Sequence, residues 1–153
     1  MADYEKTIAR AAKLCSTAEK CSYDVRTKMI SWGLAEQEAD KAIACLVEQK
    51  FLDDTRFARY FVKDKLKFNK WGRIKIGYAL RQKQLPEDVI NEALREINED
   101  AYTEILDQLI RHKMRSAGNL NIPANKAKVL RYAAQKGFTA EEVYRSLDRV
   151  QEH

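Results

Sequence analysis

The sequence predicts an all-α protein of three tandem three-helix (helix-turn-helix-like) repeats that form an elongated, curved array. Three observations predict it: helix-forming residues dominate, apolar residues recur at helical spacing, and the pattern repeats three times. Only five Gly and two Pro occur in 153 residues, and 45% of the residues are hydrophobic. That hydrophobic fraction is sufficient for a buried core and excludes a largely disordered chain.

The internal repeat is anchored on Leu34, Leu85 and Phe138, which lie 51 and 53 residues apart. Around each anchor, apolar residues fall nine and five positions before it and nine and twelve positions after it. This predicts repeats at residues 1–52, 53–98 and 99–153. Units of this size can carry small cores, and stacking of neighbours covers the remaining apolar faces, so we expect an extended array.

Capping and stop signals divide the first two repeats into helices. We expect Ser22 to cap the second helix of the first repeat and Gly33 to end it. In the second repeat, Asp53 or Asp54 starts the first helix and Pro86 fits the first turn of the third. Gly72 separates the first two helices of that repeat.

The third repeat carries one strong capping signal and one loop signal. Thr139 and Glu142 have the spacing of a capping box, which predicts a helix starting there. The stretch 116–125 contains Gly118, Pro123 and several Asn, which predicts a long loop between the first two helices.

Charge is unevenly distributed, although the net charge is only +5. Residues 56–83 contain ten basic residues and one acidic residue, whereas residues 84–110 contain eight acidic residues and one Arg. A single-sign block of this size attracts polyanions, and the alternative is an ordinary solvated helix surface. The predicted DNA-binding or filament-binding residues are Lys63, Lys65, Lys67, Lys70, Arg73, Lys75, Arg81 and Lys83.

Aromatic residues are interleaved with these cations. Phe68, Trp71 and Tyr78 either belong to the core or stack on exposed bases. Arg73 and Arg81 fall on one helical face, away from the apolar stripe. We therefore expect replacement of Arg73, Lys75 and Arg81 by Glu to leave the core intact.

The third helix of each repeat has an acidic start, which disfavours sequence-specific reading of duplex DNA. A helix-turn-helix domain places such a helix in the major groove, where carboxylates would meet phosphates. These carboxylates are Glu36, Glu38 and Asp40 in the first repeat, Glu87, Asp88 and Glu92 in the second, and Glu141 and Glu142 in the third.

The sequence contains no motif that would form a catalytic, metal or cofactor site. Cys15, Cys21 and Cys45 have irregular spacing, which predicts free thiols, with Cys15 and Cys45 on apolar faces and therefore buried. We expect no enzyme activity, no cofactor and no metal. The sequence shows no membrane-spanning stretch or signal peptide, so we expect a cytoplasmic protein.

The middle of the chain resembles the RecX family. The resemblance lies in residues 51–62 (FLDDTRFARYFV), 71–76 (WGRIKI) and 80–83 (LRQK), and the three-repeat layout extends it over the chain. One departure is Gln84, where the family usually has Gly.

The resemblance implies a monomeric protein that binds RecA and its nucleoprotein filament, together with single-stranded DNA. It implies double-stranded DNA as a second ligand, and binding of both forms of DNA without sequence specificity. It implies inhibition of RecA ATPase, strand exchange and coprotease activity, and thereby control of homologous recombination, DNA repair and the SOS response. Two alternatives stay open: a helix-turn-helix regulator of duplex DNA, and a protein-interaction scaffold without DNA contact.

Overall fold

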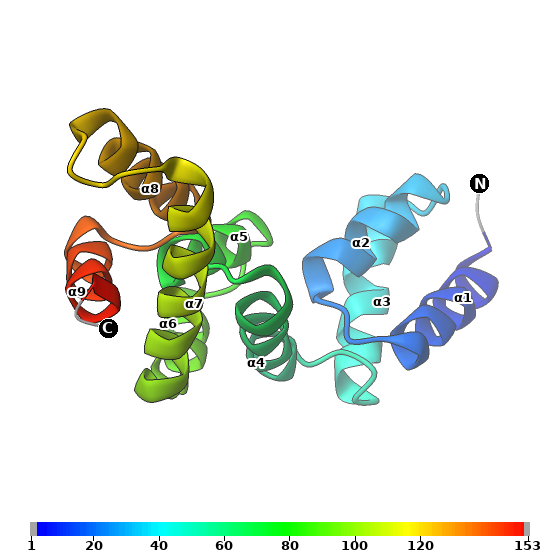
Figure 1. Cartoon of the computed structure of the whole chain (residues 1–153). Coiled ribbons are helices and arrows are strands. Elements are labelled where there is room, and N and C mark those ends of the chain that lie inside the picture. The colour runs from blue at the N-terminus through cyan, green and yellow to red at the C-terminus, as the bar shows by residue number, and fades with distance from the viewer. Residues whose placement is uncertain (1–2, 152–153) are drawn as a thin grey trace.

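The computed structural model describes residues 3–151, and this part of the chain contains helices and no strand. The predicted first and third repeats also include residues 1–2 and 152–153, which lie outside the described residues. The helices follow in three groups of three (Figure 1), as predicted. They are α1 (Tyr4–Thr17), α2 (Ser22–Ser31) and α3 (Glu36–Glu48), then α4 (Asp54–Asp64), α5 (Arg73–Gln82) and α6 (Glu87–Arg95), then α7 (Glu99–Ala117), α8 (Pro123–Lys136) and α9 (Ala140–Gln151).

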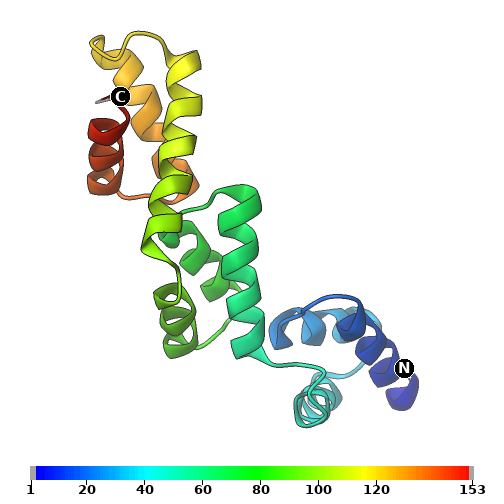
Figure 2. The ribbon, with the colours of Figure 1, turned by 60° about the horizontal axis from the view of Figure 1, so that its bottom comes forward.

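The groups succeed one another along an extended molecule, with the two ends of the chain far apart (Figures 1 and 2). A short π-helical turn, η1 (Lys65–Asn69), extends α4 and ends at Lys70 in the left-handed conformation. The long helix α7 contacts η1 of the second group as well as α8 and α9 of its own. The predicted elongated array is therefore present.

The repeat in the sequence corresponds to one recurring helix end. The residues before the three anchors, Gly33, Gln84 and Gly137, have positive φ values of 100°, 60° and 103°. In each case the anchor's backbone N–H closes the helix onto a carbonyl five residues earlier, at 3.1 Å, 3.4 Å and 3.1 Å. This is the Schellman type of helix end, which favours Gly at the left-handed position. Each anchor side chain is then buried.

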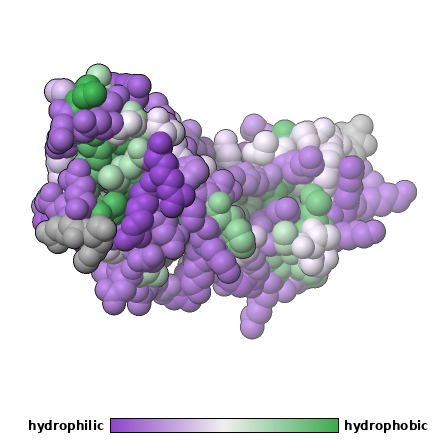
Figure 3. Space-filling view, in the orientation of Figure 1, coloured by the Kyte–Doolittle hydropathy of each residue, from purple (hydrophilic) through white to green (hydrophobic). Residues whose placement is uncertain are grey.

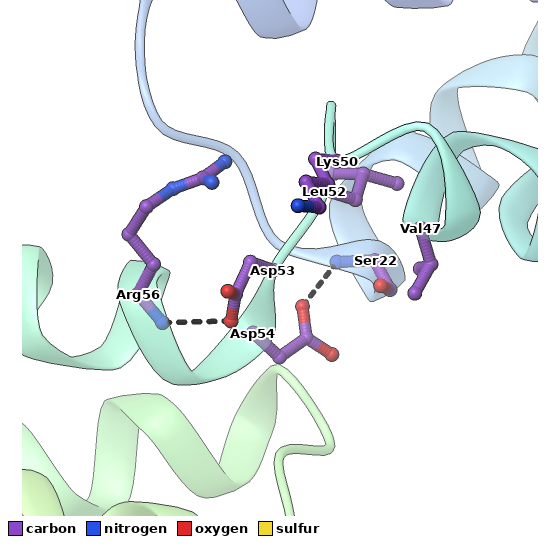
Figure 4. A pocket seen from close by; sticks show the side chains of 7 residues that line it. All are labelled: Ser22, Val47, Lys50, Leu52, Asp53, Asp54 and Arg56. Atoms are coloured by element: carbon purple, nitrogen blue, oxygen red, sulfur yellow. Dashed lines mark hydrogen bonds between the residues drawn. The ribbon is translucent and has the colours of Figure 1, made fainter.

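Two adjacent aspartates cap two different helices (Figure 4). The Asp53 side chain accepts a hydrogen bond from the Arg56 N–H at 3.0 Å and caps α4. Asp54 instead accepts from the Ser22 N–H at 2.8 Å, at the start of α2 in the preceding repeat. The prediction that Ser22 caps α2 is wrong, because Cys21 takes the N-cap position and Asp54 supplies the acceptor.

The third repeat confirms one local prediction and corrects another. Thr139 and Glu142 exchange side-chain to backbone hydrogen bonds of 2.8 Å and 3.1 Å, which is the predicted capping box. The prediction of a long loop at 116–125 is wrong at both of its ends. Helix α7 continues to Ala117 and α8 begins at Pro123, because Pro is well suited to a first helical turn.

Buried apolar residues form two cores rather than three. One lies within the first repeat, from Ala11 to Leu52. The other runs without interruption through the second and third repeats, from Phe57 to Leu147, and also includes Cys21. Cys15 and Cys45 are only half-buried, contrary to expectation, and Cys21 is the fully buried thiol. Burial raises the pKa of the Cys21 thiol to about 11, so it is protonated at neutral pH.

The first repeat meets the second through a mainly polar joint. Besides the Asp54 cap, Arg56 pairs with Glu19 at 2.7 Å and Lys83 pairs with Asp24 at 2.6 Å. A cavity of about 580 Å³ lies beside this joint, lined by residues of both repeats (Figure 4). Polar contacts and one thiol therefore connect the two cores here.

The second and third repeats meet through a close contact of backbone with backbone. The N–H groups at the start of α5 point at the carbonyl groups at the end of α8, because Gly72 donates to Lys136 at 2.7 Å and Ile74 donates to Gly137 at 3.1 Å. A Cβ atom at Gly72 would lie 2.3 Å from the Gly137 carbonyl oxygen. Both positions therefore require Gly, and the opposed ends of the two helix dipoles attract each other.

A buried carboxylate joins α7 to α9. Asp107, only 6% exposed, accepts hydrogen bonds from the Ser146 hydroxyl at 2.6 Å and from the Arg149 guanidinium at 2.8 Å and 3.1 Å. Burial alone would raise the pKa of Asp107, but these hydrogen bonds outweigh it and hold the pKa below its usual value. The carboxylate is therefore ionised in the folded protein.

Replacing Gln84 by Gly tests the recurring helix end. Gln84→Gly should raise the free energy of unfolding by about 0.5–1 kcal/mol, because Gly adopts a left-handed conformation without a Cβ clash. Urea unfolding followed by circular dichroism measures this. The matched control Gln82→Gly, in the last turn of α5, should lower it by a similar amount. Shifts of both variants in the same direction would contradict this account.

Replacing Asp107 by Asn should destabilise the protein by about 2 kcal/mol at pH 7, because Arg149 loses its charged partner. The folded pKa lies below the unfolded value of about 3.9, so this stabilisation is present above pH ~4 and disappears as the pH falls through the folded pKa. Unfolding of both proteins measured at several pH values should show the two curves converging in acid. Asp148→Asn, on the exposed side of α9, is the control and should change little. A difference that persists at low pH would argue against this role of the carboxylate.

Candidate nucleic-acid interface

The eight predicted binding residues lie on one continuous stretch, from the end of α4 to the end of α5. Lys63 is in the last turn of α4, Lys65 and Lys67 are in η1, and Lys70 follows in the left-handed turn. The remaining residues, Arg73, Lys75, Arg81 and Lys83, lie in α5 and at its C-cap. Their side chains are not equally available, because several already have partners within the chain.

Three of the eight cations are paired with carboxylates from outside the basic stretch, and a fourth, Lys65, is paired with its neighbour Asp64. Arg81 lies 2.5 Å from Glu87, and their hydrogen bond lowers the pKa of Glu87 and raises that of Arg81. Lys83 is held by Asp24 in the joint described above. The third, Arg73, is part of a larger cluster. Through Glu87 and Glu99, the acidic stretch thus neutralises part of the basic stretch.

Arg73 ties the second repeat to the third. Its guanidinium pairs with Glu99, lies 3.7 Å from Glu142, and stacks 4.1 Å from the centre of the Tyr102 ring. Its backbone N–H donates to the Tyr102 hydroxyl at 3.0 Å. Burial raises the pKa of Tyr102 to about 12, so the phenol stays neutral and can accept this bond. Arg73 is thus a structural residue of the interface between repeats.

Lys65 and Lys75 lie against the ring of Trp71. Their ammonium groups are 5.3 Å and 4.6 Å from the ring centre, and Lys65 is also 3.8 Å from Asp64. Trp71 itself is half-buried and packs edge-on against Phe61. It packs against the core, and Lys65 and Lys75 lie over its ring, so it offers less free surface than Phe68 or Tyr78.

These contacts correct the expectation that Arg73, Lys75 and Arg81 can be replaced by Glu without cost. Only Arg81 is exposed, whereas Arg73 and Lys75 are half-buried. Lys75 also packs closely against Gly137, because a Cβ at Gly137 would lie 2.5 Å from the Lys75 Cβ. The sequence places Arg73 and Arg81 on one face but does not show which neighbouring helix covers that face.

Besides Lys75, which lies against the Trp71 ring, three of the predicted cations have no carboxylate partner in the described part of the chain. Among the residues that the structure describes, Lys63, Lys67 and Lys70 form no ion pair. Lys63 and Lys67 are exposed and Lys70 is half-buried. They surround η1, where the chain also presents Phe68, whose side chain is 71% exposed.

Two exposed hydrophobic side chains lie on α5. Tyr78 is 62% exposed and Ile74 is 57% exposed, one helical turn apart on the outer side of α5. Of the three aromatic residues considered from sequence, Phe68 and Tyr78 therefore face solvent and Trp71 does not. The face seen in Figure 3 is mostly hydrophilic, with small hydrophobic areas over the third and first repeats.

A second basic stretch was not among the predicted site residues. Residues 108–140 contain seven basic residues and no acidic residue. They are Arg111, Lys113, Arg115, Lys126, Lys128, Arg131 and Lys136. The signal in the sequence is the absence of acidic residues after Asp107, up to residue 140. Gly118, Asn119 and Pro123 instead predict a loop in this stretch, which divides the basic residues between two segments.

Within residues 3–151, His, Cys, Asp and Glu side chains form no group of three that could hold a metal ion. In the same range, helices long and apolar enough to cross a bilayer are absent.

Known proteins resemble the chain over most of its length. Residues 53–94 match the family model described as RecX, second three-helix domain. The regulatory protein RecX of Clostridium tetani is 30% identical over 97% of this chain and 68% of its own length. That of Prosthecochloris aestuarii is 26% identical over 97% and 95%.

A solved structure shows the same fold. The crystal structure of RecX from Lactobacillus salivarius superposes with a TM-score of 0.84 at 16% identity, covering 98% of this chain and 97% of that one. Some other curated RecX relatives are longer, and the chain spans 44% and 56% of two of them. The similarity to the Clostridium tetani protein extends over almost the entire sequence, and the chain belongs to the RecX family of regulatory proteins.

Proposed function

We propose that the protein regulates RecA by binding its nucleoprotein filament and inhibiting ATP hydrolysis, strand exchange and coprotease activity. It would thereby control homologous recombination, DNA repair and the SOS response, acting as a monomer in the cytoplasm. The observation that carries this proposal is the similarity to a regulatory protein RecX over 97% of the chain. The inhibitory role is what membership of the family implies.

The extended shape supports binding along a filament. Three helix groups in succession offer a long surface, so one molecule can contact several neighbouring subunits and the DNA they hold (Figure 2). The array spreads its surface over three repeats. Its function on this proposal is recognition of an extended partner.

The second repeat supplies the proposed contact with DNA. Lys63, Lys67 and Lys70 are uncompensated cations, and such groups bind phosphates without reading sequence. The exposed rings of Phe68 and Tyr78 favour single-stranded DNA, because unpaired bases stack on aromatic side chains. Double-stranded DNA would be a weaker, second ligand bound through phosphates alone.

Sequence-specific reading of duplex DNA is the less favoured alternative. The first turns of α3, α6 and α9 are acidic, and these are the helices that a helix-turn-helix domain would place in the major groove. Glu87 and Glu142 are moreover engaged by Arg81 and Arg73. The carboxylates stabilise the fold and repel phosphate at the same time.

Added to RecA on single-stranded DNA, the protein should slow ATP hydrolysis at stoichiometric amounts or below. A coupled ATPase assay and a strand-exchange assay measure this. The control is an unrelated DNA-dependent ATPase at the same DNA concentration, whose rate should not change. If RecA ATPase and strand exchange both proceed unaltered with excess protein, the proposed function is wrong.

Uncompensated and paired cations of the second repeat should respond differently to substitution. The triple variant Lys63→Gln, Lys67→Gln, Lys70→Gln should change stability by less than about 0.5 kcal/mol per site. It should lower the salt slope of single-stranded DNA binding by ~0.7 per lost contact and weaken RecA inhibition.

The comparison variant is Arg73→Gln. It should lose about 1–2 kcal/mol of stability, because Glu99 and Glu142 lose their partner and the stacking on Tyr102 is removed. Urea unfolding and fluorescence anisotropy with a labelled oligonucleotide measure the two properties. Wild-type DNA affinity of the lysine variant would contradict the assignment of these residues.

A further inference from the structure

The second basic stretch, residues 108–140, is the strongest charged feature that the second-repeat site does not include. Its cations come from two helices that pack on each other, the C-terminal half of α7 and the whole of α8. Among the described residues, none of the seven is in an ion pair. Arg115, Lys126, Lys128 and Arg131 are exposed, and Arg111, Lys113 and Lys136 are half-buried.

A hydrogen bond connects this stretch to the residue that precedes Lys70. Lys113 of α7 and Lys136 of α8 both lie over the ring of Tyr132, at 4.9 Å and 5.8 Å from its centre. The Lys136 ammonium group also donates to the Asn69 carbonyl oxygen at 3.2 Å, at the end of η1. Lys70 is the next residue along the chain. Cations of the third and second repeats therefore adjoin one another at the contact between α8 and α5.

We propose that these residues form a second phosphate-binding surface, so that a single strand of nucleic acid runs from η1 across α7 and α8. We call this surface the α7–α8 ridge and define it by Lys113, Lys128, Arg131 and Lys136. The inference rests on the proposed function and extends its DNA contact from one repeat to two.

Electrostatics favours a polyanion as the occupant. Seven positive charges without a carboxylate in the same stretch create a local potential that the net charge of +5 conceals. A nucleic-acid backbone carries a charge at every nucleotide, so it can neutralise cations spread over two helices. Phe68, 71% exposed beside Lys67, adds an aromatic surface at the η1 end. That ring favours nucleic acid over an acidic polypeptide.

The rigid contact between the repeats makes a continuous path feasible. Gly72 and Gly137 hold the start of α5 against the end of α8, so Lys70 and Lys136 keep a fixed relative position. A strand bound to one set of cations therefore meets the other without reorganisation of the protein, which avoids an entropic cost of binding.

The test is single-stranded DNA binding by two double variants of the full chain. Lys113→Gln with Lys136→Gln removes the cations nearest to η1, and Lys128→Gln with Arg131→Gln removes two exposed cations of α8. Each should lower the salt slope for a labelled oligo(dT) by ~1.4 and weaken binding at least several-fold at low salt. The control is Lys6→Gln with Lys13→Gln, two exposed lysines of α1 that carry the same charge change.

Several outcomes decide the proposal. If the control variant loses as much affinity for oligo(dT) as the ridge variants, the effect comes from net charge alone and the proposal is overturned. Wild-type binding by Lys128→Gln with Arg131→Gln would also overturn it, and these exposed positions keep the test valid if the half-buried lysines are needed for folding. If polyglutamate binds as tightly as oligo(dT) and is equally sensitive to the variants, the ligand of the ridge is an acidic polypeptide and the proposal of nucleic acid is overturned.

A parallel RecA ATPase assay separates this inference from the proposed function. Ridge variants that bind oligo(dT) normally, together with a wild-type protein that inhibits RecA, would reject the ridge and leave the function intact. A wild-type protein that binds oligo(dT) through the ridge but leaves RecA unaffected would reject the function and leave the ridge intact.

Discussion

The contact between the end of α8 and the start of α5 determines how the rest of the molecule is organised. Gly72 and Gly137 allow two backbones to approach where no Cβ fits, so helix ends from different repeats exchange hydrogen bonds directly. One apolar core then extends through both repeats. The same contact places Arg73 beside Tyr102 and brings Lys136 to the end of η1. This one contact therefore determines that Arg73 stabilises the fold, whereas Lys136 belongs to the proposed binding surface.

Charge has two separate uses in the protein. Where a cation meets a carboxylate of a neighbouring repeat, as at Arg73 or Lys83, pairs of opposite charge connect one repeat to the next. Where a cation has no carboxylate partner among the described residues, as at Lys67 and Lys128, it remains exposed to solvent. An even distribution of carboxylates would neutralise both kinds of surface. The separation of acidic and basic stretches therefore allows some cations to join the repeats and leaves others exposed for binding a partner.

Local interactions could be predicted from the sequence, and non-local ones could not. Helix ends such as Gly33 and the Thr139–Glu142 box depend on residues a few positions apart, and both are present as predicted. Asp54 was recognised as a capping residue, but its partner Ser22 is 32 positions away. Likewise, the basic block was visible, whereas the pairing of Lys83 with Asp24 depends on how the repeats are joined.

The division into two cores has a consequence for synthesis of the chain. Every member of the first core lies between Ala11 and Leu52, so this core can close as soon as residue 52 has left the ribosome. The second core requires contacts between Phe57 and Leu147 and stays open until nearly one hundred further residues have emerged. During that interval the second-repeat surfaces that the third repeat covers, at η1 and at the start of α5, lack their partners. A nascent chain is therefore most exposed to aggregation while the middle repeat is complete and the last is not.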